Sequence, residues 1–464
     1  TLMRSSAASD VYKRQVQDIR RAVTYFKENI PDIKGKRVGI MSRNCYEYGV
    51  NSFGAILAGA VVVTINQKKT WPELEYELGL VEPSLIVNDG IDYGCRPDIE
   101  AAYGDKLRPM DAFKDSAPAE LVDCVGHDDL MVLMFTSGTT GRSKGVMLSE
   151  KNYFTACQMY IDGLKSVLDY EERLVPQYLD QTFSHFTLVP MFHLAGFICY
   201  FVYGVQGWTL NLCCDARDLR RDMSLMHSDA MSTPPVLVEM IYNEVKRGHA
   251  DRLNGLWNLS CSSAILDPAI LSGLVKNGFY INQCYSMTEL AGYGLLNVTQ
   301  EGDHLRALGK PDGFCEVKMD ETGEICVRGG CVMLGYYKDP EATAEVIDKD
   351  GWFHTGDIAR LEEDSYMYLT GRKKNLIILD SGENISPEEL EGMVEKCPVV
   401  QECIVKELGK KIGVVVYCEK EHQQTVRDFI AQMNRTIPLY KRIGVVEFSE
   451  TPLPRNATGK LVRK

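Results

Sequence analysis

A glycine-rich loop is the segment of this sequence whose residue types most clearly suggest chemistry. It reads TSGTTGRSKG, from Thr136 to Gly145, and follows directly on the apolar run MVLMF. Backbone N–H groups and hydroxyls in a flexible turn of this kind can surround a polyphosphate, and Lys144 adds a positive charge. The alternative is a solvated hairpin without a ligand. The candidate phosphate-binding residues are Thr136, Ser137, Gly138, Thr139, Thr140, Gly141 and Lys144.

The spacing within this loop excludes a Walker-type phosphate loop. That motif reads G-x-x-x-x-G-K-(S/T). Here only two residues separate Gly138 from Gly141, and Lys144 precedes Gly145 instead of following it. The order of residues therefore indicates another kind of nucleotide-binding loop.

Four further polar segments follow the loop, and together with it they resemble the acyl-adenylate-forming superfamily. They read QCYSMTEL (283–290), GWFHTGDIA (351–359), GRKKNLI (from 371) and PLPRNATGKLVRK (452–464). That superfamily contains acyl-CoA synthetases, aryl-CoA ligases, luciferases and the adenylation domains of peptide synthetases, and the resemblance covers residues 16–464. Its phosphate loop reads (S/T)-S-G-(S/T)-(S/T)-G-x-P-K-G, so Ser143 stands where the family has proline. Losing the fixed φ of proline predicts a looser loop.

The resemblance implies how a nucleotide and its metal ion are held. Tyr285 is expected to stack on adenine, with Ser286 beside it where the family has glycine. Thr288 is expected to contact the α-phosphate. Glu289 is expected to hold Mg²⁺ together with Thr136, and a hard cation prefers such oxygen ligands. Without the neighbouring matches, a Thr-Glu pair would indicate only a helix cap.

Asp357 and Arg372 are the ribose contacts that the resemblance implies. A carboxylate can accept two hydrogen bonds from a cis-diol, which suits Asp357 to this role. By itself, Arg372 would be interpreted as a surface charge at a linker.

Three residues are implied in the later steps of a reaction. Lys374 corresponds to the pivot between two domain orientations, where a solvated residue can change its backbone angles at little packing cost. Gly382 lies in SGENISP (381–387), and a glycine there allows the backbone to approach the pantetheine of CoA closely. Lys460 is expected to reach the carboxylate oxygen and the phosphate during adenylation, as a charged donor at developing negative charge.

An acyl pocket is implied by two further segments. VPMFHLAG (189–196) resembles the segment with a His or aromatic gate near the reacting carboxylate, which makes His193 the catalytic and pocket candidate, although a lone His is more often a core residue. Serines replace family glycines at 262, 263 and 286, which predicts a narrow, polar cavity that a very long straight chain fits poorly. The expected pocket residues are His193, Ser262, Ser263, Ala264, Ser286 and Gly294.

The sequence pattern predicts that the helices and strands positioning these residues form an α/β fold in two parts. From Lys36 to Tyr285, Val/Ile-rich runs alternate with helical-period stretches, which predicts layered, mostly parallel sheets covered by helices. After Glu301 short alternating strands predict a β-rich subdomain. We place the boundary at Gly371 to Lys374, and so predict a large adenylation body over 1–371 and a small, mobile α+β lid over 372–464. Residues 1–15 resemble a spurious translated end, and whether they are native stays open.

The composition of the chain limits which binding partners and which cellular compartment we expect. The chain has 464 residues and a formal net charge of -13, with no run of five like charges, so a nucleic-acid partner is excluded. Its longest apolar stretch, Leu194 to Val205, is shorter than a spanning helix requires, while contact with a membrane surface stays open. The 15 cysteines form no C-x-x-C pair, which favours a reduced, cytoplasmic compartment.

These observations predict an AMP-forming acid–thiol ligase. ATP and a fatty or aryl carboxylic acid would give an acyl-adenylate, and CoA would then give the thioester, with ATP, Mg²⁺ and CoA as the cofactors. An enzyme that loads a separate acyl carrier protein is the alternative, and a non-catalytic nucleotide-binding relative is a third reading. The sequence leaves open the acid, its chain length, the acceptor and the oligomeric state.

Overall fold

The computed structural model describes most of the chain, which divides into two compact units. The described residues are 2–122, 125–136, 142–170, 183–262, 266–300, 302–378, 384–409, 411–455 and 461, without the side chains of 2–12, 163–170, 205–206, 378 and 384. The body unit comprises Thr1–Glu316 and Val327–Phe353, and the C-terminal unit comprises Val317–Cys326 and His354–Lys464. The boundary predicted at Gly371 assigns the β-rich segment differently and stays a prediction.

A seven-stranded sheet forms the first layer of the body unit. Its order is β15-β6-β5-β2-β1-β3-β4; strands β5, β2, β1, β3 and β4 run parallel to one another, β6 is antiparallel to β5, and β15 is antiparallel to β6. The strands are β1 (Arg37–Met41), β2 (Val61–Thr64), β3 (Leu85–Asn88), β4 (Leu107–Pro109), β5 (Leu130–Thr136), β6 (Lys144–Ser149) and β15 (Gly335–Tyr336). The helices α1 (Leu2–Asn29), α2 (Tyr46–Leu57), α3 (Trp71–Val81) and α4 (Arg96–Tyr103) accompany it. Strand β2, VVVT, is wholly buried, as expected where helices cover a parallel sheet.

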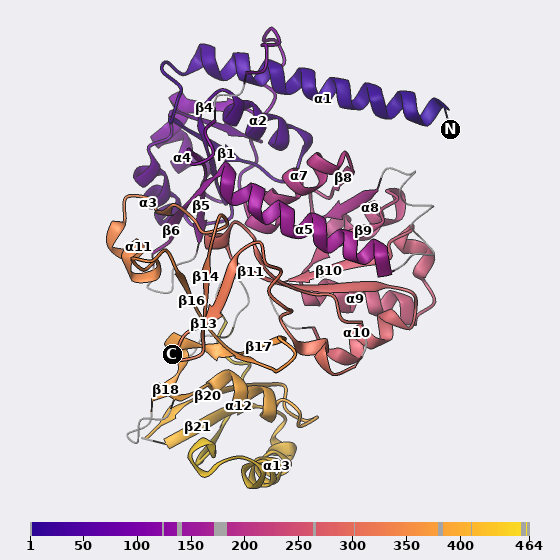
Figure 1. Ribbon diagram of the computed structural model, residues 1–464, viewed down its shortest axis with the longest axis vertical. Helices are drawn as coiled ribbons and strands as arrows, with labels where there is room; N and C mark the ends of the chain where they lie inside the picture. Colours follow the sequence, from indigo (N-terminus) through magenta and orange to yellow (C-terminus); the bar gives the residue numbers. More distant parts are fainter. Residues whose placement is uncertain are drawn as a thin grey trace. The chain divides into compact units, whose positions relative to one another are not determined.

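A six-stranded sheet forms the second layer of the body unit. Its order is β12-β11-β10-β9-β7-β8, parallel except at β12. The strands are β7 (Ser184–Thr187), β8 (Thr209–Leu212), β9 (Ala230–Thr233), β10 (Asn258–Ser262), β11 (Tyr280–Ser286) and β12 (Gly294–Asn297). The helices are α5 (Glu150–Tyr170), α7 (Leu194–Gln206), α8 (Leu219–Leu225), α9 (Pro235–Lys246) and α10 (Pro268–Val275). Figure 1 shows α5 and α7 on one side of these strands and α9 and α10 on the other.

The β-rich segment forms a four-stranded sheet in the order β13-β14-β16-β17. Its strands are β13 (Glu316–Met319), β14 (Glu324–Arg328), β16 (Phe353–Leu361) and β17 (Met367–Arg372), and helix α11 (Pro340–Val346) lies between β15 and β16 in the chain. Strands β16 and β17 pair antiparallel, with a register shift between Ile358 and Ala359.

The rest of the C-terminal unit is a small α+β structure with its own core. It contains β18 (Ile377–Ile378), β19 (Asn384–Ile385), α12 (Pro387–Val394), β20 (Glu402–Leu408), β21 (Lys411–Tyr417), α13 (Gln423–Thr436) and β22 (Val445–Ser449). Strands β20, β21 and β22 form one sheet, whose buried valines pack with Leu390 and Ile430 of the two helices.

Short 3-10 helices occur in both units. They span Gly104–Lys106, Ala216–Asp218, Ala250–Leu253, Thr288–Leu290, Asp303–Arg306, Lys373–Asn375, Lys420–His422 and Leu439–Lys441.

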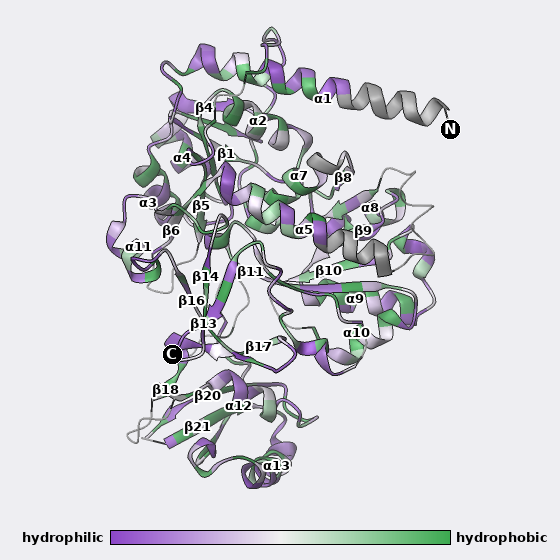
Figure 2. Ribbon diagram, viewed as in Figure 1, coloured by the Kyte–Doolittle hydropathy of each residue, from purple (hydrophilic) through white to green (hydrophobic). Residues whose placement is uncertain are grey.

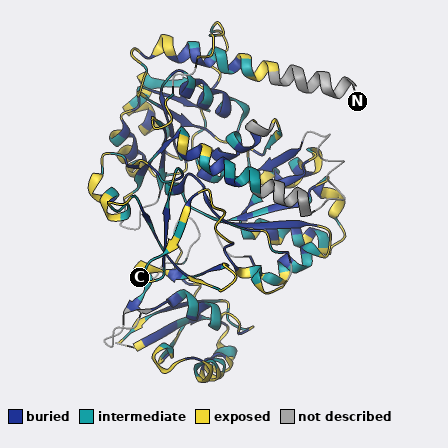
Figure 3. Cartoon of the chain, in the orientation of Figure 1, coloured by how far each residue is buried: buried dark blue, intermediate teal, exposed yellow. Residues whose placement is uncertain are grey.

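The predicted fold class is confirmed: layered, mostly parallel sheets with helices, a β-rich region and a small α+β part. Figure 3 shows the strands mainly in the buried colour. Helix α7 carries the longest apolar stretch and is largely hydrophobic in Figure 2. Within the described part of the chain, no helix is long and apolar enough to span a bilayer.

Candidate functional site

The two ends of the predicted phosphate loop lie at paired positions in the seven-stranded sheet. Thr136 ends β5 and Lys144 begins β6, and the two are register partners in the antiparallel pair. The two strands that flank the loop are therefore hydrogen-bonded neighbours, which brings its two ends together. Five of its predicted phosphate contacts lie outside the described residues, namely Ser137, Gly138, Thr139, Thr140 and Gly141.

The C-terminal stem of the loop is fastened to helix α3. The Ser143 hydroxyl donates a hydrogen bond to the carboxylate of Glu77, a side chain that is only 4% exposed and also accepts from Lys69. The guanidinium of Arg142 lies 5.3 Å from the centre of the Tyr76 ring, a cation–π contact with the same helix. A side-chain hydrogen bond thus holds Ser143 at the position where the family has proline. The hydrogen bond to Glu77 opposes the loosening that the loss of proline predicts.

Lys144 and Glu289 contact different parts of one side chain, that of Tyr336. The Lys144 ammonium lies 4.7 Å from the centre of the Tyr336 ring, and the Tyr336 hydroxyl donates to Glu289 at 3.0 Å. Burial and the Glu289 carboxylate raise the pKa of the Tyr336 phenol well above its ordinary value, so it remains a donor. Strand β15 carries Tyr336 beside β6, opposite Val146. We call Thr136, Lys144, Glu289 and Tyr336 the phosphate corner.

Tyr336 was not predicted from the sequence. It lies in a Tyr-Tyr pair after a glycine, and nothing in that pattern separates it from an ordinary core aromatic. Glu77 was missed for a similar reason, because a single Glu on an amphipathic helix normally faces water. Only the tertiary structure brings these two residues to the loop.

The QCYSMTEL segment turns sharply after strand β11. Tyr285 and Ser286 end the strand half-buried, and Thr288 and Glu289 lie in the 3-10 turn that follows. Ala291, directly after this turn, has a φ of 53°, a left-handed conformation that a non-glycine residue adopts only at a cost. Backbone strain of this kind clusters at functional sites. The turn places Glu289 at the phosphate corner three residues after Ser286.

A cavity lies between the six-stranded sheet and helices α5 and α7. Its volume is about 760 Å³, counting the part open to solvent. Of the predicted pocket residues, Ser262 and Ser286 line it. His193 does not: it is exposed and caps α7, where its Nδ1 accepts the N–H of Ala195 at 3.3 Å. Ser263 and Ala264 lie outside the described residues.

Gly294 has a structural reason for being glycine. It pairs with Ser286 across β11 and β12, and a Cβ placed on it would lie 1.7 Å from the carbonyl oxygen of Tyr285. The close approach of the two strands at the end of the cavity therefore requires glycine at this position. Gly294 is not among the residues that line the cavity in the described part of the chain.

In the C-terminal unit, the two predicted ribose contacts lie side by side. Asp357 on β16 and Arg372 on β17 are cross-strand register partners, and the guanidinium Nε lies 2.9 Å from the Asp357 carboxylate. Asp357 is 1% exposed and Arg372 46% exposed, so the pair presents a guanidinium over a buried carboxylate. The β16–β17 pairing explains why residues 15 positions apart in the sequence belong to one pair.

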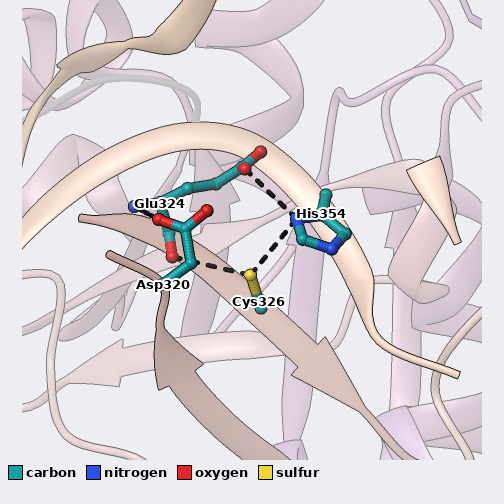
Figure 4. Close-up of side chains that lie close together, drawn as sticks. All are labelled: Asp320, Glu324, Cys326 and His354. Atoms are coloured by element: carbon teal, nitrogen blue, oxygen red, sulfur yellow. Dashed lines mark hydrogen bonds and ion pairs between the residues drawn. The ribbon is translucent and has the colours of Figure 1, made fainter. Parts of the chain in front are cut away.

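A cluster of possible metal ligands lies in the same unit. Oxygen, nitrogen and sulfur atoms of Asp320, Glu324, Cys326 and His354 lie within 4.8 Å of one another (Figure 4). However, the Lys373 ammonium already lies 2.6 Å from Glu324 and 3.7 Å from Asp320. Hydrogen bonding to Glu324 raises the pKa of Lys373, and burial raises the pKa of Cys326 to about 11, so the ammonium is retained and the thiol stays protonated. The cluster balances charge around Lys373 and fixes the chain between Arg372 and Lys374.

The remaining predicted residues are only partly described. Lys374, the expected pivot, is exposed in the 3-10 turn Lys373–Asn375. Gly382 and Lys460, predicted for thioester formation and adenylation, lie outside the described residues.

Comparison with known proteins places this chain in a family. The sequence model described as "AMP-binding enzyme" matches residues 32–337, and the chain belongs to that family. Feruloyl-CoA synthase of Amycolatopsis sp is 30% identical over 451 residues, which cover 92% of this chain and 88% of the relative. Long-chain-fatty-acid–CoA ligase of Escherichia coli O157:H7 is 26% identical over 511 residues, covering 97% and 88%.

A solved structure confirms the fold over nearly the whole chain. O-succinylbenzoate Coenzyme A synthetase from Bacillus subtilis, in complex with ATP and magnesium ion, superposes with a TM-score of 0.77 at 22% identity, covering 96% of this chain and 92% of that one. The resemblance inferred from the phosphate loop and the downstream segments is confirmed.

Proposed function

We propose that this protein is an AMP-forming acid–thiol ligase that converts a carboxylic acid to its CoA thioester through an acyl-adenylate. One arrangement in the body unit supports this most directly. Ser286 lines the cavity, and Glu289, three residues later, belongs to the phosphate corner. An acid seated in the cavity with its carboxylate towards Ser286 therefore presents that carboxylate where Lys144 and Glu289 receive a nucleotide's phosphates.

In the first step, a carboxylate oxygen of the acid bonds to the α-phosphorus of ATP, and pyrophosphate leaves. Lys144 and the loop hydroxyls bind the phosphates, and Thr288 contacts the α-phosphate. Glu289 and Thr136 would hold Mg²⁺, because they offer the oxygen ligands that it prefers, and the bound ion would offset the phosphate charge. Lys460 donates to the carboxylate oxygen and the phosphate, where negative charge develops.

In the second step, the thiolate of CoA attacks the acyl carbon, the thioester forms and AMP leaves. Asp357 and Arg372 hold the ribose through both steps, while Tyr285 stacks on the adenine. Lys374 serves as the pivot that exchanges the two reaction geometries, and Gly382 lets the backbone approach the pantetheine. Binding an activated intermediate between two easier steps follows the logic of covalent catalysis.

The relatives and the thiols support the proposed substrate class and compartment. The printed names of relatives include a feruloyl-CoA synthase and a long-chain-fatty-acid–CoA ligase, which favours an aryl or fatty acid. Free thiols at all fourteen described cysteines suit the reducing cytoplasm.

Pyrophosphate release tests the proposal, measured with ATP and a panel of aryl and fatty acids. Release should require an acid, and the Lys460→Ala variant should lose at least about 100-fold of it, because a charged donor to the developing charge is removed. Thioester formation from supplied acyl-adenylate should survive in that variant within about threefold. Lys464→Ala, in the same segment, is the matched control and should retain both activities.

Three outcomes would contradict this assignment. Equal loss of both half-reactions in Lys460→Ala would refute the separate roles of the two steps. Mg-ATP binding without acid-dependent pyrophosphate release would indicate a non-catalytic relative. Transfer to a holo acyl carrier protein but not to CoA, detected by product mass, would change the acceptor.

A further inference from the structure

The six-stranded sheet has one apolar face, which packs on helices α9 and α10. Phe186, Met231, Leu259 and Ile281, one from each of four neighbouring strands, belong to the buried core on that side. Alternate residues of a strand point to opposite faces. The residues on either side of these four in sequence therefore face the cavity and helix α7.

That second face is polar, although the helix opposite it is apolar. Ser232, Ser260 and Asn282 are register partners across β9, β10 and β11, and all three line the cavity. Helix α7 faces them with side chains that include Ile198 and Val202. A sheet face against such a helix is normally apolar, because a buried polar group without a partner costs about 1 to 3 kcal/mol. The Asn282 amide donates to Asn258 Oδ1 at 3.3 Å, so part of this polar row is satisfied within the protein, and the group on this face that indicates a polar ligand is His185.

His185 supplies the sharpest observation on this face. It is 1% exposed, lines the cavity from β7, and stacks on Tyr203 with ring centres 4.2 Å apart. Its Nε2 accepts the backbone N–H of Ser232 at 3.4 Å, so the proton of the neutral ring lies on Nδ1. Nδ1 is buried and has no hydrogen-bond partner in the described part of the chain. Burial lowers the pKa of this imidazole to about 3, so the ring is a neutral donor at physiological pH.

We propose that this cavity selects carboxylic acids whose tail carries an oxygen acceptor far from the carboxylate, and that His185 Nδ1–H donates to that oxygen. This inference rests on the proposed ligase function and specifies its substrate class. A plain hydrocarbon tail leaves a buried donor in the pocket without a partner, which costs binding free energy. Such a pocket therefore discriminates against the plain acid more strongly than an apolar pocket discriminates against the oxygen-substituted acid.

The sheet register sets the length of the tail. His185 lies in the same row as Tyr280, three strands away, and Ser286 lies six residues further along β11. At about 3.3 Å per residue and 4.8 Å per strand, the Cα atoms of His185 and Ser286 are roughly 25 Å apart in a flat sheet, and less in a twisted one. An oxygen at the end of a chain of about 12 to 16 carbons therefore suits His185, given the reach of the two side chains.

Matched pairs of acids test the inference in the pyrophosphate-release assay. Dodecanoic acid is compared with 12-hydroxydodecanoic acid, and hexadecanoic acid with 16-hydroxyhexadecanoic acid. The hydroxylated acid should have an about tenfold higher kcat/KM in at least one pair. In His185→Phe that ratio should fall to about one, whereas His185→Gln, which keeps an N–H donor, should retain part of it. The ratio compares two acids on the same enzyme preparation, so a partly folded variant does not distort it.

Each other outcome has a defined meaning. Equal or better use of the plain acid in both pairs overturns the inference, as does a preference that survives in His185→Phe. Turnover of short aryl acids alone also overturns it, because the tail would then not reach His185. If no acid in any panel releases pyrophosphate, the ligase proposal itself fails, and the two failures are thereby distinguished.

Discussion

Ser143 illustrates how one residue can replace a missing restraint. Proline would hold the loop stem through its ring, whereas Ser143 holds it through a hydrogen bond to the buried Glu77. We expect Ser143→Ala to raise the KM for ATP about three- to tenfold, because the stem loses its tether and Glu77 loses a donor. Ser143→Pro should restore the affinity by restoring the fixed φ. Pyrophosphate exchange at varied ATP measures both, and an unchanged KM in Ser143→Ala would show that the tether has no role in binding.

His185 should also make the stability of the protein depend on pH. Its pKa is about 3 in the folded state, against about 6.5 when unfolded. Below pH 6.5 only the unfolded state takes up this proton, so the stability is complete above that pH and is lost as the pH falls towards 3. At pH 5 the loss from this group is about 2 kcal/mol.

Urea unfolding at pH 7 and pH 5 measures this effect. The decrease in unfolding free energy should be about 2 kcal/mol smaller in His185→Gln than in the unmodified protein. Other titrating groups are common to both proteins and cancel in the comparison. Equal decreases would mean that the folded state lets His185 take up its proton.

At the scale of elements, the contact between β11 and β12 depends on Gly294. A Cβ at this position would collide with the Tyr285 carbonyl, so the strands would have to separate. We expect Gly294→Ala to lower the unfolding free energy by about 3 kcal/mol. Gly79→Ala in helix α3 is the matched control: nothing lies within 4 Å of its added methyl, so it should raise stability by about 0.5 to 1 kcal/mol. Thermal unfolding of both variants compares them directly, and a neutral Gly294→Ala would mean that β12 can shift freely.

The elements themselves were largely predictable from the sequence, and their mutual contacts were not. Apolar runs such as MVLMF predicted strands because a strand covered on both faces needs continuous hydrophobicity. In β10, by contrast, the pattern NLSCS buries alternate residues in a core and turns the serines towards a cavity. Composition cannot distinguish that polar face from a solvent-exposed face. The pairing of Asp357 with Arg372 needed the register of β16 and β17, and Tyr336 needed the addition of β15 to a sheet whose other strands come much earlier in the chain.

For the whole molecule, the net charge of -13 bears on substrates that are themselves anions. The global field opposes ATP, pyrophosphate and CoA, so local groups must supply the attraction. The structure provides such groups in both units, with Lys144 against Tyr336 in one and the exposed Arg372 over Asp357 in the other. Each unit also has its own buried core, which is the basis for separate folding units.

The distribution of sulfur has a practical consequence. Of the fourteen described cysteines, Cys214 is exposed, Cys45 is half-buried and the other twelve are buried. Burial raises the pKa of Cys157, Cys199 and Cys261 to about 12, so these thiols are nearly inert to alkylation while the protein is folded. Other buried cysteines, such as Cys403, lie in the C-terminal unit. The rate at which each cysteine-containing peptide becomes labelled therefore measures how fast its own unit opens. Alkylation of the buried cysteines thus reports the unfolding of each unit separately.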